Sequence, residues 1–460
     1  MSTRIRFCTT FLFLCLAAGL CGQSFPGLAF DNYAGINGLL LNPANAAANR
    51  VGFELHAASV SAGVANDYIG IGSYKAAGEI DWDSDLLRNP RADNGLHVNA
   101  DLLGPSLLLG LGKRAGLGLI TRVRTVYDVE NIDGRLFEGL QNEFGTASFA
   151  SEMTDHRSVL HGWGEVGVVL GVSVLDNQFF TLKVGGAAKR LLGVGAVYTQ
   201  SDRLRADYDA GAETLTTAGD FTYGRTGEFY FEDLDLEDLP GYYKDPAGTG
   251  TAFDLGATFE WRPGGIPDTV TWTPYRLKVG VSLTDLGRID YTGGERTRFA
   301  ADNTLDRAAV EGESLEGVLY GYYDGTTTDG ARSVRLPTAL HLMADLRLAG
   351  KLYVTALSTT AFATDDAEGM GNRARTTLLV APRLETKLLS LYVPARFGGT
   401  EGTTVGAGLR FWLLTVGSNS LLSHLFTDTN YAADVYVGAK LPFYRASKPG
   451  GKNKTLPTAR

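Results

Sequence analysis

The amino-acid sequence predicts an all-β protein, namely a transmembrane antiparallel β-barrel of about 14 strands with a short N-terminal plug. Three observations predict this fold. Segments of about ten residues alternate between apolar and polar side chains, short and long connections take turns between them, and the N-terminus reads as an export signal. Counts of about 12 to 16 strands fit the same segments, and an even number is required if both ends of the barrel chain lie on one side of the membrane.

The clearest strand is Asp434–Phe443. Its odd-numbered side chains, from Val435 to Phe443, are all apolar, whereas its even-numbered side chains include Tyr436 and Lys440. A tilted strand of about ten residues just crosses the apolar layer of a bilayer. Alone, the segment also fits an edge strand of a soluble sandwich, so the other segments must decide. A last strand that ends on an aromatic residue resembles the closing strand of outer-membrane barrels, which the barrel assembly machinery reads.

The same alternation recurs along the chain, and the connections between the strands differ in length. Alternating segments lie at residues 96–102, 253–261, 277–283 and 340–348. Tight turns lie at 112–115, 176–178 and 349–351, and long polar connections at 66–94, 129–160, 201–250 and 291–335. Outer-membrane barrels have short periplasmic turns and long external loops. Splitting Thr403–Asn419 into two short strands that turn near Trp412 and Leu413 completes the expected count.

The first residues form a basic start, an apolar run at Phe11–Leu20 and a small-residue exit, which are the three parts of a secretory signal peptide. The apolar run is shorter than the roughly 20 residues that a membrane-spanning helix needs. We place cleavage after Gly22. Lipidation of Cys21 is disfavoured, because Leu20 stands where a lipoprotein signal has a small residue.

Export would change both the thiol content and the charge of the protein. The three cysteines, Cys8, Cys15 and Cys21, all lie in the expected signal. Loss of Arg4 and Arg6 leaves 40 basic residues against 51 acidic ones and changes the net charge from −9 to −11. This acidic balance argues against nucleic-acid binding.

The segment Asn32–Asn45 precedes the first strand and is expected to form the plug. Asn42 is suited to cap a helix and Pro43 to begin one, and the alanines that follow would extend it to about Asn49. An Asn-Pro-Ala turn is often just a capped turn, but here it follows a glycine-rich stretch directly before a barrel. In this it resembles the plug that opens the fatty-acid-transporter (FadL-like) superfamily. The resemblance suggests ligand-proximal roles for Tyr33, Asn37, Asn42, Pro43 and Asn45.

Later stretches resemble a narrower group. Residues 280–291, 381–387 and 406–410 are similar to motifs of uncharacterised outer-membrane proteins from Bacteroidetes-type bacteria, within the FadL-like and PorV-like superfamily. The resemblance covers about residues 23–443. It implies export by the secretory route to the outer membrane of a Gram-negative-type bacterium, among outer-membrane lipids and lipopolysaccharide. The expected organisation is a signal peptide at 1–22, a plug segment at 23–50, a barrel at 51–443 and a disordered periplasmic tail at 444–460.

The polar faces of the strands carry charges of both signs. A wide selective pore usually shows rings of one sign, whereas mixed charges suit a lumen that pairs with itself or with a plug. The side chains expected to face the lumen include Arg122, Arg124, Asp254, Asp345, Arg347 and Arg410.

Enzymatic and metal chemistry is not expected. The six histidines are scattered without a zinc-binding pattern, and Asp155-His156 with His161 is a weak catalytic signal. Acidic clusters at 81–85 and 232–238 could gather Ca²⁺ or bridge lipopolysaccharide, but they lack the glycine and distal glutamate of an EF-hand loop. Solvated acidic loops are the favoured interpretation, and no cofactor is expected.

Two functions fit these features. The first is a FadL-like conduit for small hydrophobic molecules across the outer membrane. The alternative is a non-transporting barrel that acts as a scaffold or shuttle for secreted or surface proteins, as in the PorV-like branch. A bound small hydrophobic ligand would favour the first function and a secreted-protein partner the second.

We expect export to remove residues 1–22 and to leave a mature protein without thiols. Intact mass of the membrane-extracted protein, combined with thiol labelling, measures this. A labelled cysteine in the mature chain would show that the segment is retained.

Overall fold

The structure is a computed structural model that describes residues 29–47, 49, 51–72, 86–112, 114–142, 144–145, 147–227, 244–265, 275–311, 313–362, 370–427 and 429–444. The expected signal peptide, the acidic clusters at 81–85 and 232–238, and residues 445–460 of the expected tail lie outside the described residues.

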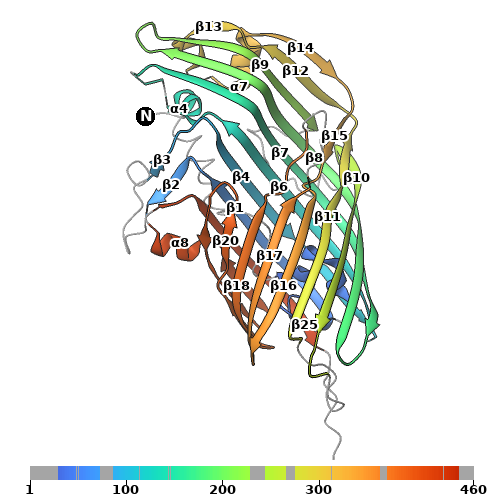
Figure 1. The fold of residues 1–460 in the computed structure, drawn as a ribbon. Helices are drawn as coiled ribbons and strands as arrows, with labels where there is room; N and C mark the ends of the chain where they lie inside the picture. Colours follow the sequence, from blue (N-terminus) through green and yellow to red (C-terminus); the bar gives the residue numbers. More distant parts are fainter. Residues whose placement is uncertain are drawn as a thin grey trace, which may run out of the picture.

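The described residues form a closed antiparallel β-barrel of 14 strands, which confirms the predicted fold class (Figure 1). The first and last strands, β1 and β25, pair from Ala65 and Ala432 to Val51 and Tyr444 and so close the wall. In order around the wall the strands are β1 (Val51–Asn66), β4 (Asn94–Leu103) with β5 (Ser106–Leu111), β6 (Ala115–Ile132), β7 (Phe149–Asp176), β8 (Phe180–Asp209), β10 (Gly248–Trp261), β11 (Leu277–Tyr291), β15 (Arg332–Arg335) with β16 (Ala339–Ala349), β17 (Leu352–Ala361), β18 (Thr377–Glu385), β19 (Leu389–Tyr392) with β20 (Ala395–Gly398), β21 (Thr404–Val405) with β22 (Ala407–Phe411), β23 (Leu414–Ser418) and β25 (Ala432–Tyr444).

Several wall strands are interrupted yet pair with a shared neighbouring strand on both sides of the break. Pro105 separates β4 from β5, Pro337 separates β15 from β16, and Pro394 separates β19 from β20. Proline has no N–H to donate to a strand ladder, so pairing stops at these positions and resumes beyond them. The predicted turn near Trp412 is also present: β22 and β23 flank it, and Trp412 takes a φ of 48°.

The outside of the wall is apolar and the inside is polar. On β25, Val435, Val437 and Phe443 are exposed, whereas Tyr436 and Lys440 are buried, and this alternation repeats around the wall. Apolar side chains turned outward on a closed sheet are typical of barrels that face lipid, where every backbone group must be paired internally. Separately, among the described residues no helix combines the length and the apolar character needed to span a membrane.

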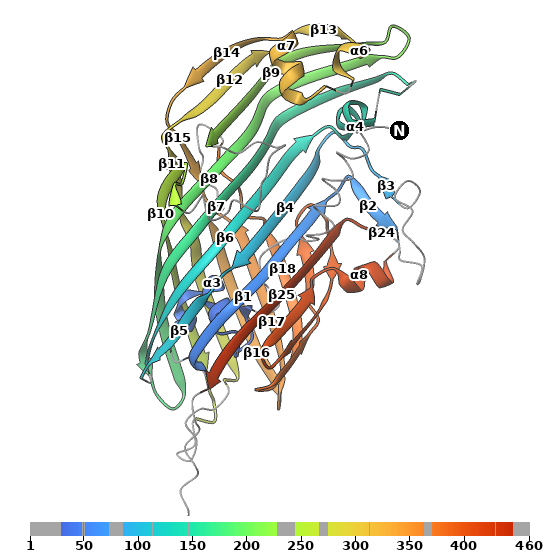
Figure 2. The ribbon, with the colours of Figure 1, turned by 180° about the vertical axis from the view of Figure 1, so that it is seen from behind.

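Two wall strands run far beyond the others at the end with long connections. Strand β7 has 28 residues and β8 has 30. Their distal halves join an outer extension that Figures 1 and 2 show above the wall. Its other parts are β9 (Thr214–Gly227), β12 (Gly294–Ala300), β13 (Asn303–Asp306), β14 (Asp324–Asp329), α6 (Arg307–Val310) and α7 (Leu315–Tyr322).

The outer extension corrects part of the sequence analysis. The connections at 129–160, 201–250 and 291–335 were expected to be polar loops, but much of each one is β-strand or helix. The reason is a core of its own, in which Met153, Leu204, Tyr208, Leu215 and Phe299 are buried. These apolar side chains are spaced among Thr, Arg and Asp, so the average polarity of the segments conceals their alternation.

Smaller elements connect the outer ends of the strands. A sheet of three short strands joins β2 (Ile69–Gly72), β3 (Leu86–Arg88) and β24 (Thr429–Asn430). Two helices lie on the same side, α4 (Gly134–Asn142) and α8 (Leu421–Phe426). The first and the last long connections of the chain are therefore tied to each other.

We predict that an arginine on the outward face of β16 is costly. Leu342 is 50% exposed there and lies opposite Val281. If Leu342 lies near the middle of the membrane, Leu342→Arg should lower the free energy of unfolding by about 2–4 kcal/mol, because it places a charge in lipid. Urea unfolding in lipid vesicles, followed by tryptophan fluorescence, measures this.

Thr216→Arg is the matched control. Thr216 is exposed on β9 in the outer extension and lies opposite Asp207, so the new charge stays in water near a carboxylate. Little change in the free energy of unfolding is expected for Thr216→Arg. Equal losses in the two variants would contradict a lipid-facing Leu342.

Candidate functional site

The inside of the barrel holds a plug, residues 29–47, at the end with the short turns (Figure 2). The plug contains helix α3 (Ile36–Leu41) and a 3₁₀ turn, η1 (Pro43–Ala46). Asn42 caps η1 as expected, because its side-chain Oδ1 accepts a hydrogen bond from the Ala44 N–H at 3.0 Å. The expected helix to about Asn49 is wrong, since η1 ends at Ala46 and Ala47 is extended. Contacts with the wall outweigh the helix propensity of the alanines here.

The first residues of the plug are held by charged side chains of β18 and β22. Arg410 on β22 donates from Nε to Asp31 Oδ2 at 2.9 Å, and both side chains are fully buried. Burial raises the pKa of the Asp31 carboxyl, but Arg410 and Arg383 outweigh it and lower that pKa to about 2. The pair is therefore charged at neutral pH. Glu385 on β18 accepts from both the backbone N–H and the side-chain amide of Asn32 at 3.1 Å.

The next residues are held by β25 and β1. Lys440 on β25 donates from Nζ to the carbonyl oxygens of Tyr33 at 2.5 Å and Ala34 at 2.6 Å. Glu54 on β1 accepts from the Ile36 N–H at 2.9 Å and lies 3.3 Å from Lys440 Nζ. The charged side chains thus replace water for backbone groups of the plug that have no strand partner.

The opposite side of the plug rests on a row of four glycines. Gly116, Gly171, Gly185 and Gly256 lie on β6, β7, β8 and β10 and are directly opposite one another in register. A Cβ on Gly171 would lie 2.7 Å from the Ala47 nitrogen, and one on Gly185 only 2.5 Å from the Ala44 nitrogen. Real Cβ atoms do not approach backbone atoms so closely, so the row admits the turn because its members have no side chain.

Strands β10 and β11 add hydrogen bonds to this contact. The Asn42 side-chain amide donates to the carbonyls of Ala257 at 3.1 Å and Val281 at 3.0 Å. The Ser282 hydroxyl donates to the Leu41 carbonyl at 2.6 Å. The plug therefore spans the lumen from the β18–β1 side of the wall to the β6–β11 side.

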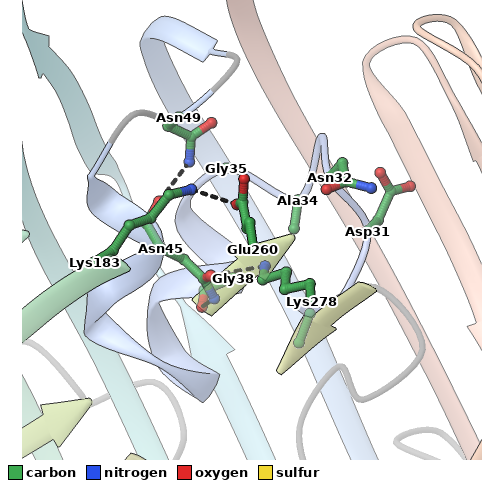
Figure 3. Close-up of a pocket in the computed structure, with 11 residues that line it drawn as sticks. Asp31, Asn32, Ala34, Gly35, Gly38, Asn45, Asn49, Lys183, Glu260 and Lys278 are labelled. Carbon is green, nitrogen blue, oxygen red and sulfur yellow. Dashed lines mark hydrogen bonds and ion pairs between the residues drawn. The ribbon is translucent and has the colours of Figure 1, made fainter. Parts of the chain in front are cut away.

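A small polar cavity lies between the plug and the wall (Figure 3). Its volume of about 40 Å³ has room for water but not for an aromatic ring or a lipid chain. Lys278 donates to Asn45 Oδ1 at 3.0 Å, and Lys183 pairs with Glu260 at 2.6 Å across it. The surroundings of Asn45 are thus polar.

A second charged cluster lies above the plug on five neighbouring strands, β6, β7, β8, β10 and β11. Arg124 contacts Glu165 at 3.1 Å and Asp285 at 2.7 Å. Lys189 contacts Asp254 at 2.8 Å and Asp285 at 2.7 Å. Two of the expected lumen residues, Arg124 and Asp254, are therefore brought together through Lys189 and Asp285, and the lumen charges neutralise one another.

Arg122 borders this cluster, directly opposite Glu165 in register, and the remaining expected lumen residues lie outside it. Arg122 is buried and makes a bidentate pair with Asp101, and Asp345 is fully buried against Arg383 at 2.9 Å. Arg347 lies near the end of β16, where its Nε donates to the carbonyl of Gly350 in the short turn at 2.8 Å. Arg410 holds the plug, as described above. The sequence analysis missed Glu54, Glu385, Lys440 and the glycine row as plug contacts.

Among the residues proposed as ligand-proximal, Asn42, Pro43 and Asn45 face the wall. The Arg410 guanidinium lies over the Tyr33 ring, with its Cζ 5.2 Å from the ring centroid. Asn37 is buried in α3. Their proximity to a ligand stays a prediction.

The family described as "Family of unknown function (DUF5723)" matches residues 43–419. The chain belongs to this family. A search of curated proteins finds no match. Among solved structures, the Pseudomonas putida toluene transporter TodX is 11% identical, with 90% of this chain and 95% of that chain covered and a TM-score of 0.44. A Pseudomonas aeruginosa FadL homologue is 15% identical, with 92% and 94% covered and a TM-score of 0.39. Likenesses at this level do not assign a function.

The outer mouth of this DUF5723 barrel is narrowed by residues 370–376, which connect β17 and β18 yet reach the opposite wall. The Asn372 amide donates to Asp128 Oδ2 at 2.9 Å and to the Val159 carbonyl at 3.0 Å, on β6 and β7. Met370 is buried against Val159 and Tyr198. Because β6 and β7 lie across the barrel from β17, this segment crosses the lumen.

A larger cavity of about 340 Å³ lies beside that crossing segment. Apolar and charged side chains share its lining, among them Leu96, Val129, Ala361, Glu130 and Arg375. A molecule the size of a single aromatic ring fits in this volume, whereas a folded protein segment does not.

Both histidines that were weighed for catalysis have hydrogen-bond partners in this DUF5723 protein. His156 is buried between the Glu130 carbonyl and the Thr199 hydroxyl, and His161 contacts the Tyr291 hydroxyl at 3.0 Å. Within the described part of the chain, no group of three or more His, Cys, Asp or Glu side chains is placed to hold a metal ion.

We predict that a methyl group on the glycine row displaces the plug. Gly185→Ala should speed the hydrogen exchange of the α3 and η1 amides, because its Cβ collides with the backbone at Ala44. Gly186→Ala is the matched control, since a Cβ there meets its nearest atom at 3.5 Å. Exchange mass spectrometry of the folded proteins in detergent measures this. Equal protection in the two variants would contradict the packing of the plug on this row.

Proposed function

We propose that this DUF5723 protein is an outer-membrane conduit that the plug closes, and that its cargo is small hydrophobic molecules. One observation carries the proposal: the plug fills the lumen without contributing a strand to the sheet. Its contacts with the wall include hydrogen bonds that Glu54 and Glu385 accept and that Arg410 and Lys440 donate, and packing on the glycine row. Such an element can shift while every strand of the wall stays paired.

The energetics favour movement of the plug over opening of the sheet. A hydrogen bond contributes about 0.5–1.5 kcal/mol net, and about 1.5–3 kcal/mol when one partner is charged. The bonds that hold the plug are fewer than the backbone hydrogen bonds in the ladder of a 14-strand wall. Moving the plug costs far less than opening the sheet.

The outer-membrane location rests on the closed sheet with an apolar exterior, and on the export signal expected at residues 1–22. The size of the outer cavity, about 340 Å³, suits a small molecule, and Leu96, Val129 and Ala361 give part of its lining an apolar character. The resemblance to FadL-like proteins implies the same class of cargo.

We predict that deletion of residues 32–49 leaves a barrel that inserts but conducts ions more readily, because the polar lumen is no longer filled. Single-channel conductance in planar bilayers compares the deleted and the intact proteins. Heat-modifiable migration in gels checks that both barrels are folded.

If the deletion barrel is folded but its conductance is unchanged, the plug is not the element that closes the conduit. A secreted protein that co-purifies with the intact chain in stoichiometric amount, together with unchanged conductance, would support the scaffold function instead.

A further inference from the structure

Helix α8 turns its apolar side chains away from the protein. Leu421, Leu425 and Phe426 are 48%, 54% and 81% exposed, and Phe426 is the most exposed of the large apolar side chains that the structure describes. Residues four apart lie on the same face of a helix, so Leu421 and Leu425 form one outward stripe, which Phe426 borders. The apolar face of α8 is thus open to its surroundings.

The polar side of α8 faces the wall instead. Ser423 is buried, and its hydroxyl accepts a hydrogen bond from the Val405 N–H on β21 at 2.7 Å. Just after the helix, the Thr427 hydroxyl donates to the Ser423 carbonyl at 2.7 Å. A helix on the surface of a water-soluble protein has the opposite arrangement, with its apolar stripe against the core and its polar residues outside. The inverted arrangement is the one expected where the surroundings of the helix are apolar.

The start of α8 is fixed to strand β25. The Asp434 carboxylate accepts hydrogen bonds from the Asn419 N–H and from the Ser420 hydroxyl, each at 2.7 Å. The Asn419 side-chain amide also donates to this carboxylate at 2.7 Å. Hydrogen bonds to a charged acceptor are stronger than those between neutral groups. The helix is therefore anchored to the wall, and its outward face is a fixed feature of the fold.

The exposed face of α8 continues the apolar outer surface of the wall. Leu414 and Val416 are exposed on β23, the strand that leads into α8. On β25, Val437 and Val435 are exposed, and Val435 directly follows the Asp434 that holds the start of the helix. Figures 1 and 2 show α8 beside the wall, at a height between the two ends of β25. The exposed side chains of α8 thus adjoin those that face lipid.

Strand β23 is short for a strand that crosses a membrane. It has five residues, Leu414–Ser418. At about 3.3 Å per residue and a tilt of about 45°, five residues rise about 12 Å along the membrane normal, against an apolar band of about 25 Å on barrels of this kind. On this side of the barrel, α8 therefore adds apolar surface beyond the end of the strand.

We propose that α8 is a membrane-contact helix, whose Leu421, Leu425 and Phe426 side chains lie among lipid acyl chains at the margin of the outer leaflet. Acyl chains fit this face because it adjoins the lipid-facing surface of the wall and because the helix turns its polar side inward. Their contact removes three large apolar side chains from water. The proposal goes beyond the conduit function and holds whatever the lumen carries.

A fluorescent label at position 426 tests the proposal. The mature chain is expected to have no thiol, so Phe426→Cys gives a single site for a nitrobenzoxadiazole dye. In phosphatidylcholine vesicles, nitroxide groups near the headgroup end of the acyl chains should quench this label more than nitroxide groups near the terminal methyl, because α8 lies at the margin of the apolar layer. Leu425→Cys, which keeps Phe426, should give the same pattern.

Two reference positions calibrate the label. Thr216 is exposed in the outer extension, so a label on Thr216→Cys should be quenched by iodide in the water and not by the nitroxide lipids. Leu342 is exposed on the outside of β16, so a label on Leu342→Cys should be quenched by the lipids and should emit at a shorter wavelength. Iodide should quench the label at position 426 several-fold less than the label at position 216.

Two outcomes would overturn the proposal. If the label at position 426 responds as the label at position 216 does, α8 lies in water. If neither iodide nor the nitroxide lipids quench it, protein covers the helix, either a second copy of the chain or another partner. Heat-modifiable migration of each labelled variant shows that the barrel is folded.

Discussion

The pairing of β1 with β25 is the contact on which the rest of the structure depends. It turns an open sheet into a wall without edges, so every strand can lie in lipid with its backbone groups satisfied. Closure also fixes two environments, one outside for apolar side chains and one inside for polar ones. Val437 and Tyr436 are neighbours in sequence, yet one is half exposed on the outside and the other is fully buried inside.

Closure also explains why the lumen is so highly charged. The plug enters the lumen as two short helical pieces, and its Ile36 N–H and its Tyr33, Ala34 and Leu41 carbonyls are bonded by the wall. Long charged side chains reach these groups from several strands. Burying them is costly unless each is paired, and the opposite charges on neighbouring strands meet that condition.

Much of the fold could be predicted because the pattern of each strand and turn lies within a short continuous stretch of the sequence. The alternation of apolar and polar side chains in Asp434–Phe443 predicted the last strand and its two faces. The turn near Trp412 was predicted between two strands that are only a few residues long. The glycine row could not be predicted in the same way. Gly116, Gly171 and Gly185 are separated by many residues and become neighbours only through register, which a single sequence does not reveal. The strands of the outer extension were not predicted, because their apolar core residues are separated by many polar residues.

The plug has a different chemistry on each side, and this bears on selectivity. A conduit for apolar molecules must not leak ions. On the polar side, Lys183, Glu260 and Lys278 leave a cavity of only about 40 Å³ beside the plug. On the side of Ile36 and Leu39, contact with the wall is apolar and excludes water. The plug is therefore held mainly by ion pairs and hydrogen bonds on one side and by apolar packing on the other, so opening the two sides would have different costs: unpaired charges on the first and exposed apolar surface on the second.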